Sequence, residues 1–252
     1  MTRRRFYAPP AAFAPDGAAV VLSAEESRHL RDVLRLRAGD EAFVFDGEGR
    51  EFACAVTRAG GRGEGARLEV RREAAPPRPE SPLDLTLAVG LLKGEKFDLV
   101  VQKATELGAS RVVPVLTKRA DVRLRDERDA ASRVERWRRL ALEAAKQSGR
   151  ARLPAVETPA AFDAFVARAP RGGELRLLFA ERDGRGLDEA APESAPAVSA
   201  LVGPEGGWDD AELEEARRLG WRLVTLGGRT LRAETAAIAV ATILQHRFGD
   251  VR

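Results

Sequence analysis

The first third of the chain alternates short apolar segments with glycine-rich turns, a pattern that predicts the strands of a small β-barrel. One amphipathic helix interrupts this pattern, because Ser23 can cap a helix that presents Leu30 and Leu34 on one face. We therefore expect a small barrel that carries one helix. The segments expected to form its strands are 20–22, 42–45, 52–56 and 67–70.

Beyond this region, strand-like segments alternate with helix-like ones. Apolar runs of strand length are followed by apolar residues at helical spacing, and this alternation indicates a parallel sheet covered on both faces. The second region is therefore predicted to be an α/β domain. Its expected strands are 85–89, 111–116, 175–180, 198–202 and 223–226, and its expected helices are 96–107, 131–148, 209–219 and 233–248.

A proline-rich stretch separates the two patterns. Its prolines cannot lie inside a helix or a central strand, so they favour a stiff connection between domains. We predict a barrel domain over 1–75, a linker over 76–82 and the α/β domain over 83–252.

Composition narrows the class of protein. The 252 residues include a single cysteine, Cys54, and two histidines, which excludes an intrachain disulfide and disfavours a Cys/His metal site. No apolar run approaches the roughly 18 to 20 residues that span a bilayer, and the N-terminus lacks the apolar region of a signal peptide. We expect a cytoplasmic protein that binds no metal and no membrane.

Basic residues are concentrated in the middle of the chain. Residues 111–152 contain 13 lysines and arginines against 6 aspartates and glutamates, although the formal net charge of the whole chain is only +3. Such a block is a candidate nucleic-acid footprint, but solvated helix faces would give the same composition.

Two glycine-centred turns near the C-terminus are the strongest candidates for a ligand site. The turn 203–207, Gly-Pro-Glu-Gly-Gly, follows one predicted strand, and Gly227 follows the next. Loops at the carboxyl ends of parallel strands commonly line one pocket. Neither turn has the spacing of a phosphate loop or of a dinucleotide-binding motif, which excludes a nucleotide-dependent dehydrogenase.

These turns, read with the residues that follow them, resemble a known family. The segments 203–207 and 226–236, the latter containing Leu231-Arg232-Ala233-Glu234-Thr235, are similar to the signature of the SPOUT-class RNA methyltransferases, specifically the RsmE family of 16S ribosomal RNA uridine-N3 methyltransferases. Segments 29–40, 102–108 and 143–150 extend the resemblance over nearly the whole chain. One departure is Thr230, where the family usually has isoleucine.

The resemblance implies a fold and a cofactor. It implies a C-terminal SPOUT methyltransferase domain with an α/β trefoil knot, a small N-terminal PUA-like β-barrel, and a homodimer that binds S-adenosyl-L-methionine. The residues expected to bind this cofactor are Leu178, Phe179, Glu181, Val202, Gly203, Pro204, Glu205, Gly206, Gly207, Leu226, Gly227, Leu231, Arg232 and Thr235.

The same resemblance implies methylation of uridine 1498 in the 16S RNA of the small ribosomal subunit. The reaction needs an anion at uridine N3, and Arg232 is the first candidate to stabilise that anion, with Arg229 second. Glu205 or Glu234 is expected to accept the proton or to orient Arg232. The target base must leave its stack before transfer, because N3 lies on the pairing edge.

Five arginines are candidate contacts to RNA phosphates: Arg3, Arg4, Arg5, Arg35 and Arg150. Two other functions stay open. One is a SPOUT ribose 2′-O-methyltransferase that acts on tRNA or rRNA, and the other is a non-catalytic knotted protein that binds RNA.

Overall fold

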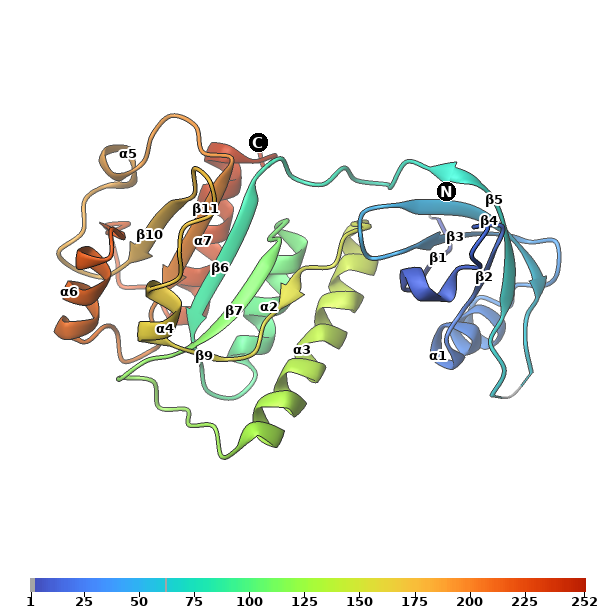
Figure 1. Cartoon of the computed structure of the whole chain (residues 1–252), viewed down its shortest axis with the longest axis horizontal. Coiled ribbons are helices and arrows are strands. Elements are labelled where there is room, and N and C mark those ends of the chain that lie inside the picture. The colour runs from blue at the N-terminus through green and yellow to red at the C-terminus, as the bar shows by residue number, and fades with distance from the viewer. Residues whose placement is uncertain (1–2, 62) are drawn as a thin grey trace. The chain divides into compact units, whose positions relative to one another are not determined.

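The computed structural model describes residues 3–61 and 63–252, which form two compact units (Figure 1). The first unit comprises the chain up to Glu80 together with Ala145–Leu153, and the second comprises Ser81–Ala144 and Pro154–Arg252. The boundary between Glu80 and Ser81 falls inside the segment 76–82 that is expected to link two domains, and a short piece from the middle of the chain joins the first unit as well.

The first unit is built on a five-stranded sheet with the order β1-β3-β4-β5-β2. Register shifts at Ala53/Cys54 and Val56/Arg58 disturb the pairing of β4 with β5, and such bulges bend a strand. The predicted helix begins as expected, since the Ser23 hydroxyl accepts a hydrogen bond from the backbone of Glu26, and it continues as a π-helical turn, η2 (His29–Val33). The other elements are β1 (Arg5–Tyr7), η1 (Pro10–Ala12), β2 (Ala19–Val21), α1 (Ala24–Arg28), β3 (Glu41–Phe45), β4 (Glu51–Arg58) and β5 (Arg67–Ala74).

A buried ion pair explains why 145–153 belongs to the first unit. Arg5 Nη2 lies 2.8 Å from the carboxylate of Glu51, whose side chain is fully buried. The same guanidinium donates to the carbonyl of Lys146 at 3.2 Å and to that of Arg150 at 2.9 Å. Arg150 in turn pairs with Glu80 at 2.7 Å. A sequence pattern cannot reveal these pairings between distant segments, which is why the predicted domain 83–252 differs from the observed unit.

The second unit is a parallel sheet with the order β12-β10-β11-β6-β7-β8, in which β9 also pairs with β7. The sequence correctly predicts this α/β architecture, but not the shortest elements. Its strands are β6 (Asp84–Gly90), β7 (Arg111–Leu116), β8 (Ala155–Val156), β9 (Ala160–Ala161), β10 (Leu175–Phe179), β11 (Ala197–Val202) and β12 (Arg222–Val224). Its helices are α2 (Lys96–Glu106), α3 (Glu127–Ser148), α4 (Phe162–Val166), α5 (Leu187–Ala190), α6 (Asp210–Arg218) and α7 (Ala233–Phe248), and the last turn of α3, from Ala145 onwards, belongs to the first unit.

Helices cover both faces of this sheet (Figure 1). One apolar cluster joins the strands to α2, α3, α5 and α7, and a second joins them to α4 and α6. Successive residues of β10 belong to opposite clusters, since Phe179 packs on the α7 side and Leu178 on the α6 side. This alternation directs neighbouring side chains within a strand to opposite faces of the sheet.

Candidate functional site

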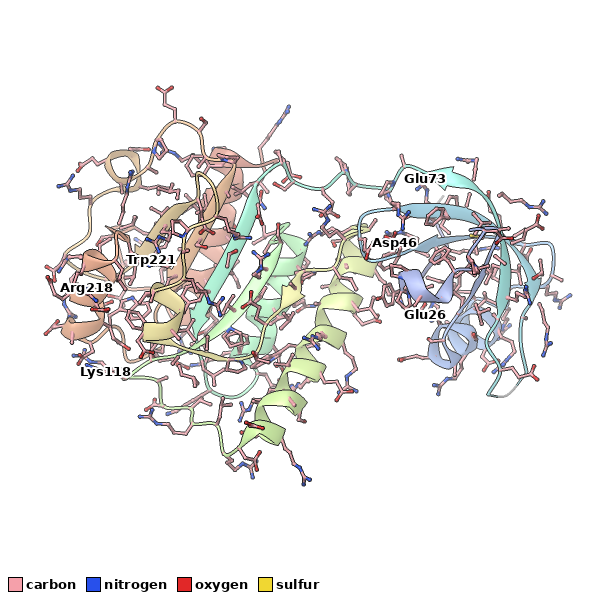
Figure 2. The ribbon with its side chains drawn as sticks, in the orientation of Figure 1. Glu26, Asp46, Glu73, Lys118, Arg218 and Trp221 are labelled. Atoms are coloured by element: carbon pink, nitrogen blue, oxygen red, sulfur yellow. The ribbon has the colours of Figure 1, made fainter. Side chains whose placement is uncertain are left out.

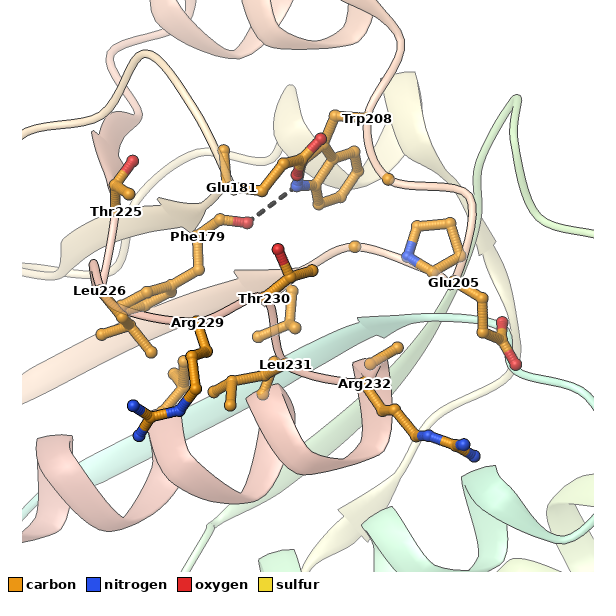
Figure 3. A pocket seen from close by; sticks show the side chains of 18 of the residues that line it. Phe179, Glu181, Glu205, Trp208, Thr225, Leu226, Arg229, Thr230, Leu231 and Arg232 are labelled. Carbon is orange, nitrogen blue, oxygen red and sulfur yellow. Dashed lines mark hydrogen bonds between the residues drawn. The ribbon is translucent and has the colours of Figure 1, made fainter.

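Loops at the carboxyl ends of β10, β11 and β12 enclose a cavity of about 580 Å³ (Figure 3). The volume lies within the usual range for small-molecule sites. Both glycine turns line this cavity, together with the first residues of α7. The two turns are separated in the sheet by β10, so the segment after β10 forms the third side.

Trp208 ties two of these loops together. Its indole Nε1 donates a hydrogen bond to the carbonyl of Phe179 at 2.8 Å, and the ring is buried (Figure 3). The ring also lies beneath the first glycine turn, because a Cβ on Gly203 would be only 3.0 Å from Nε1. The hydrogen bond and the packing of the indole ring therefore hold the 203–207 loop in position relative to the end of β10.

Three positions in the turns require glycine. Gly207 has φ of +67°, and a Cβ there would lie 2.8 Å from Glu181 Oε1. Gly227 and Gly228 have φ of +74° and +73°, with open space around both Cβ positions. The requirement at Gly207 is both conformational and steric, whereas at Gly227 and Gly228 it is conformational alone.

Most residues expected to bind the cofactor do line the cavity, but three candidates do not. Leu178 is buried on the opposite face of the sheet, Thr235 is exposed on α7, and Glu234 lies outside the lining as well. The predicted residues that line it are Phe179, Glu181, Val202, Gly203, Pro204, Glu205, Gly206, Gly207, Leu226, Gly227, Leu231 and Arg232.

The structure adds residues that sequence reasoning missed. A stripe of α7 residues lines the cavity at helical spacing, namely Ala233, Ala236 and Val240, which a helical projection from Arg232 would have found. Lys96 comes from the start of α2, and no motif marks it. The remaining additions are Ala180, Trp208, Thr225 and Gly228. The cavity is also lined by Thr230, which the sequence already places in the pocket wall, and by Arg229, a candidate for catalysis.

Glu205 is held by an ion pair at the edge of the cavity. Its Oε1 accepts a hydrogen bond from Lys96 Nζ at 2.9 Å and a longer one from the backbone N–H of Lys93 at 3.4 Å. Burial raises the pKa of this carboxyl, but the hydrogen bonds from Lys96 and the backbone outweigh that effect, so the pKa of Glu205 is lowered from its ordinary value. The group is therefore ionised at neutral pH and is a weak proton acceptor.

Arg232 occupies the position before the first turn of α7 and is exposed. Its side chain extends on the same side of the cavity as that of Glu205, whereas Arg229 points the opposite way (Figure 3). Among the described residues, the Arg232 guanidinium has no carboxylate within ion-pair distance. A cation of this kind at the rim is available to an anionic group that enters the site.

A second set of contacts joins the 203–209 loop to the end of β7. Lys118 Nζ lies 3.0 Å from Asp209 Oδ1, and the Lys118 backbone N–H donates to Glu212 Oε1 at 2.9 Å. Asp209 caps α6 through a complete capping box with Glu212. These contacts fix the carboxyl end of the loop, where it enters α6.

The five arginines expected to contact RNA differ in their surroundings. Arg5 and Arg150 have side chains that are only 7% and 6% exposed, and both are engaged within the first unit. Arg3 also pairs with Glu51, at 3.0 Å. Arg4 and Arg35 are exposed. A phosphate can therefore reach Arg4 and Arg35 directly. To reach Arg5 or Arg150 it would first have to displace the carboxylate that each of them pairs with.

The described residues contain neither a metal-binding cluster nor a membrane-spanning helix. Over residues 3–61 and 63–252, no cluster of three histidine, cysteine, aspartate or glutamate side chains is arranged to hold a metal ion. No helix in the same described part of the chain combines the length and apolarity that crossing a membrane requires.

Comparison with known proteins finds relatives that share one name. Residues 79–245 match the family model of an RNA methyltransferase domain, and residues 22–64 match that of an RNA methyltransferase PUA domain. Ribosomal RNA small subunit methyltransferase E of Synechocystis sp. is 36% identical over 230 residues, which cover 90% of this chain and 73% of the relative. The Bacillus subtilis protein of the same name is 30% identical, over 90% of this chain and 89% of its own.

A solved structure is similar over the full length. The crystal structure of a ribosomal RNA small subunit methyltransferase E from Neisseria gonorrhoeae, bound to S-adenosyl methionine, aligns with a TM-score of 0.87 and 32% identity, covering 100% of both chains. Both the barrel unit and the parallel-sheet unit therefore have counterparts in one solved protein.

Proposed function

Because the chain belongs to the family of ribosomal RNA small subunit methyltransferase E, we propose that it methylates N3 of uridine 1498 in 16S ribosomal RNA. The methyl donor is S-adenosylmethionine, which is bound in the Neisseria gonorrhoeae structure. The observation that carries the proposal is the cavity formed by the glycine turns after β11 and β12, with Glu205 and Arg232 at its edge.

The residues present fit this cofactor. Phe179, Leu226, Leu231 and Val240 provide apolar surface for an adenine ring, and the glycine turns expose backbone groups that can pair with its edge. The Glu181 carboxylate lines the same cavity and can accept hydrogen bonds from ribose hydroxyls. S-adenosylmethionine supplies an activated methyl group on a sulfonium, so the chain has to position the acceptor and make it nucleophilic.

Arg232 is the residue that we assign to the acceptor. Loss of the N3 proton leaves negative charge on O2 and O4 of uracil, and a guanidinium near these oxygens stabilises the anion. Arg232 is suited to this task because it is exposed at the rim and has no described carboxylate partner. Arg229, which extends in the opposite direction, is the weaker candidate (Figure 3).

Glu205 is better suited to orient Lys96 than to take the proton. Its pKa is lowered, which reduces its basicity, and its carboxylate already accepts hydrogen bonds from Lys96 and Lys93. The Lys96 ammonium is thereby held at the cavity wall, where it adds a second positive charge near the developing anion. The N3 proton then leaves to water when the base is bound.

The target uridine must be unpaired, because N3 lies on the Watson–Crick edge. Exposed Arg4 and Arg35 of the barrel unit are our candidates for phosphate contacts that hold the RNA. The substrate is the small ribosomal subunit, and the reaction belongs to the cytoplasm, where that subunit is assembled.

The active form is proposed to be a homodimer. Leu231 is 41% exposed and Leu226 and Ile243 are exposed as well, which leaves apolar side chains on and before α7 open to solvent. A second copy that covers α7 would bury these apolar groups.

The path of the chain supports the trefoil knot of SPOUT enzymes. Strand β12 lies at the outer edge of the sheet beyond β10, whereas the next helix, α7, packs against β11, β6 and α2. The 225–232 loop must therefore return from the edge to the centre. Knots are rare in proteins, so this return path would be a specific property of the fold.

Transfer of label tests the proposal. Small ribosomal subunits that lack the methyl group are incubated with the protein and S-adenosylmethionine carrying a labelled methyl, and the 16S RNA is then isolated. We expect label in the RNA with the wild type and a large loss with Arg232→Ala, whose cofactor affinity stays near that of the wild type. Cofactor binding without transfer by the wild type would instead indicate a non-catalytic RNA-binding protein.

A further inference from the structure

Four neighbouring strands carry a row of polar residues near their amino ends. Arg176 of β10 pairs in register with Ser199 of β11, Ser199 pairs with Thr86 of β6, and Thr86 pairs with Arg111 of β7. Partners in register on adjacent strands project to the same face of a sheet. The four side chains therefore form a continuous polar row across the sheet.

The row is confined to one end of the strands. Two residues further along, the same face carries Leu178, Leu201, Ala88 and Val113, all fully buried. Parallel strands that are covered on both faces are normally apolar throughout, so packing alone does not call for hydroxyls and arginines here. Thr86 and Ser199 are nonetheless buried.

A cavity of about 300 Å³ opens over this row. The connection between α4 and β10 supplies Arg168, Arg171 and Glu174 to its wall, and Trp221 (Figure 2) and Phe165 supply aromatic surface. None of its lining residues lines the cofactor cavity. Ser199 and Val202 are three residues apart on β11, so the row lies roughly 10 Å from the end of that strand.

Hydrogen bonds fix the polar groups around the cavity. Thr86 Oγ1 accepts from Arg111 at 3.1 Å and from Arg171 at 2.7 Å. The Ser199 hydroxyl donates to Glu174 at 2.7 Å. Burial raises the pKa of Glu174, but the bonds from Ser199 and Arg171 outweigh it and the pKa is lowered, so this carboxylate is ionised at neutral pH.

Positive charge exceeds negative charge in the lining. Four arginines, Arg111, Arg168, Arg171 and Arg176, face two glutamates, Glu157 and Glu174. Glu157 is shared, since it lies 3.2 Å from Arg111 and 2.9 Å from Arg168. The Glu157 carboxylate thus pairs with two guanidinium groups, and each guanidinium keeps N–H donors that do not bind Glu157.

Aromatic rings hold two of the arginines in place. The Arg168 guanidinium lies over the ring of Phe165, with 5.0 Å between its carbon and the ring centroid, and Arg176 lies over Trp221 at 5.4 Å. Arg176 also donates to the carbonyls of Val166 and Arg168, just past the end of α4. An arginine that is already oriented loses little side-chain entropy when it binds an anion.

We propose that this cavity is a second RNA contact, which binds a phosphate of the ribosomal RNA backbone through Arg168 and Arg111. The proposal rests on the function assigned above, because it takes ribosomal RNA as the substrate. A phosphate suits the site because guanidinium forks bind its oxygens in pairs. The distance from the cofactor cavity means that a nucleotide other than the reacting uridine occupies the site.

The test compares two arginines that differ in location. Arg168 is 46% exposed and lines the cavity, whereas Arg218, on α6 (Figure 2), is 67% exposed, pairs with Glu215 and lies outside the lining. Binding of small ribosomal subunits by the wild type, Arg168→Ala and Arg218→Ala is measured over a range of salt concentrations. Thermal melting and cofactor affinity show that each variant is folded.

We expect Arg168→Ala to weaken subunit binding several-fold and to reduce the slope of log Kd against log salt by about 1. KM for subunits should rise while kcat and cofactor affinity stay unchanged. If Arg168→Ala binds subunits like Arg218→Ala, the proposed contact is wrong, including when both bind more weakly. Failure of the wild type to transfer methyl while this binding difference persists would count against the proposed function alone.

Discussion

The ammonium of Lys96 lies 2.9 Å from the carboxylate of Glu205, and this ion pair joins the start of α2 to the glycine turn after β11. The two residues are far apart in the sequence, yet both line the cofactor cavity. The pair lowers the pKa of Glu205 and holds the Lys96 ammonium at the cavity wall, where the proposed mechanism needs positive charge.

Replacing Lys96 tests whether the Lys96–Glu205 ion pair lowers the pKa of Glu205. In Lys96→Met we expect the pKa of Glu205 to rise, because burial remains while the strongest opposing hydrogen bond is lost. A carboxyl with a lowered folded-state pKa stabilises the fold above its unfolded pKa, and this contribution disappears as the pH falls through the folded value. The wild type should therefore lose more stability than Lys96→Met when the pH is lowered below the ordinary value of 4.5.

Carbon-detected NMR of the Glu205 carboxyl measures this pKa directly. Lys103→Met is the matched control, since Lys103 lies on the same helix and pairs with Glu106 at 2.9 Å. An unchanged Glu205 titration in Lys96→Met would show that the ion pair does not determine the pKa.

Trp208→Phe should weaken cofactor binding. The substitution keeps the apolar ring but leaves the buried carbonyl of Phe179 without its donor, at a cost of about 1–3 kcal/mol. Trp221→Phe removes an equivalent bond, from Nε1 to the Val166 carbonyl at 3.1 Å, outside the cofactor cavity. Denaturant unfolding should show similar losses for both, whereas calorimetry should show weaker binding of S-adenosylmethionine for Trp208→Phe only. Equal affinities would refute the role of Trp208.

Arg5 is predicted to stabilise the first unit. Among the described residues, Arg5→Ala leaves the fully buried Glu51 carboxylate with Arg3 as its ion-pair partner, and breaking a buried pair in this way typically costs about 3–5 kcal/mol. Arg4→Ala, on the neighbouring exposed residue, should leave the unfolding free energy unchanged and weaken RNA binding instead. Urea unfolding and subunit binding of both variants test whether Arg5 stabilises the fold and Arg4 binds RNA. An Arg5→Ala variant with unchanged stability and weaker RNA binding would contradict this assignment.

Cys54 should be chemically inert in the native protein. Burial raises the pKa of its thiol to about 12, so hardly any thiolate is present at pH 8. We expect negligible reaction with a thiol reagent at this pH and full reaction after unfolding in denaturant. Rapid modification under native conditions would mean that β4 opens readily.

The sequence was sufficient for the longer helices and strands and for both glycine turns, but not for the shortest elements. Helical spacing correctly predicts α7, and the capping residues Asp209 and Glu212 locate the start of α6. The sequence could not predict the ion pairs, because Lys96 and Glu205 come together only through the order of the strands in the sheet. Leu178 was misplaced for a simpler reason, since neighbours on a strand face opposite sides and only Phe179 points to the α7 side.

The arginines show a second limit of sequence reasoning. Arg4 and Arg5 are adjacent and chemically identical, but one is exposed and the other is enclosed by Glu51 and the end of α3. A count of basic residues cannot separate a phosphate contact from a buried counterion. Arg4 precedes β1 and is open to solvent, whereas Arg5 begins β1 and its guanidinium is engaged by Glu51.

The position of the methyl group tests the central claim most directly. Small ribosomal subunits without the modification are incubated with the protein and S-adenosylmethionine, and nuclease fragments of the 16S RNA are sequenced by mass spectrometry. We predict one added methyl, on the base of uridine 1498 at N3. A methyl on a ribose, or on a different nucleotide, would contradict the account.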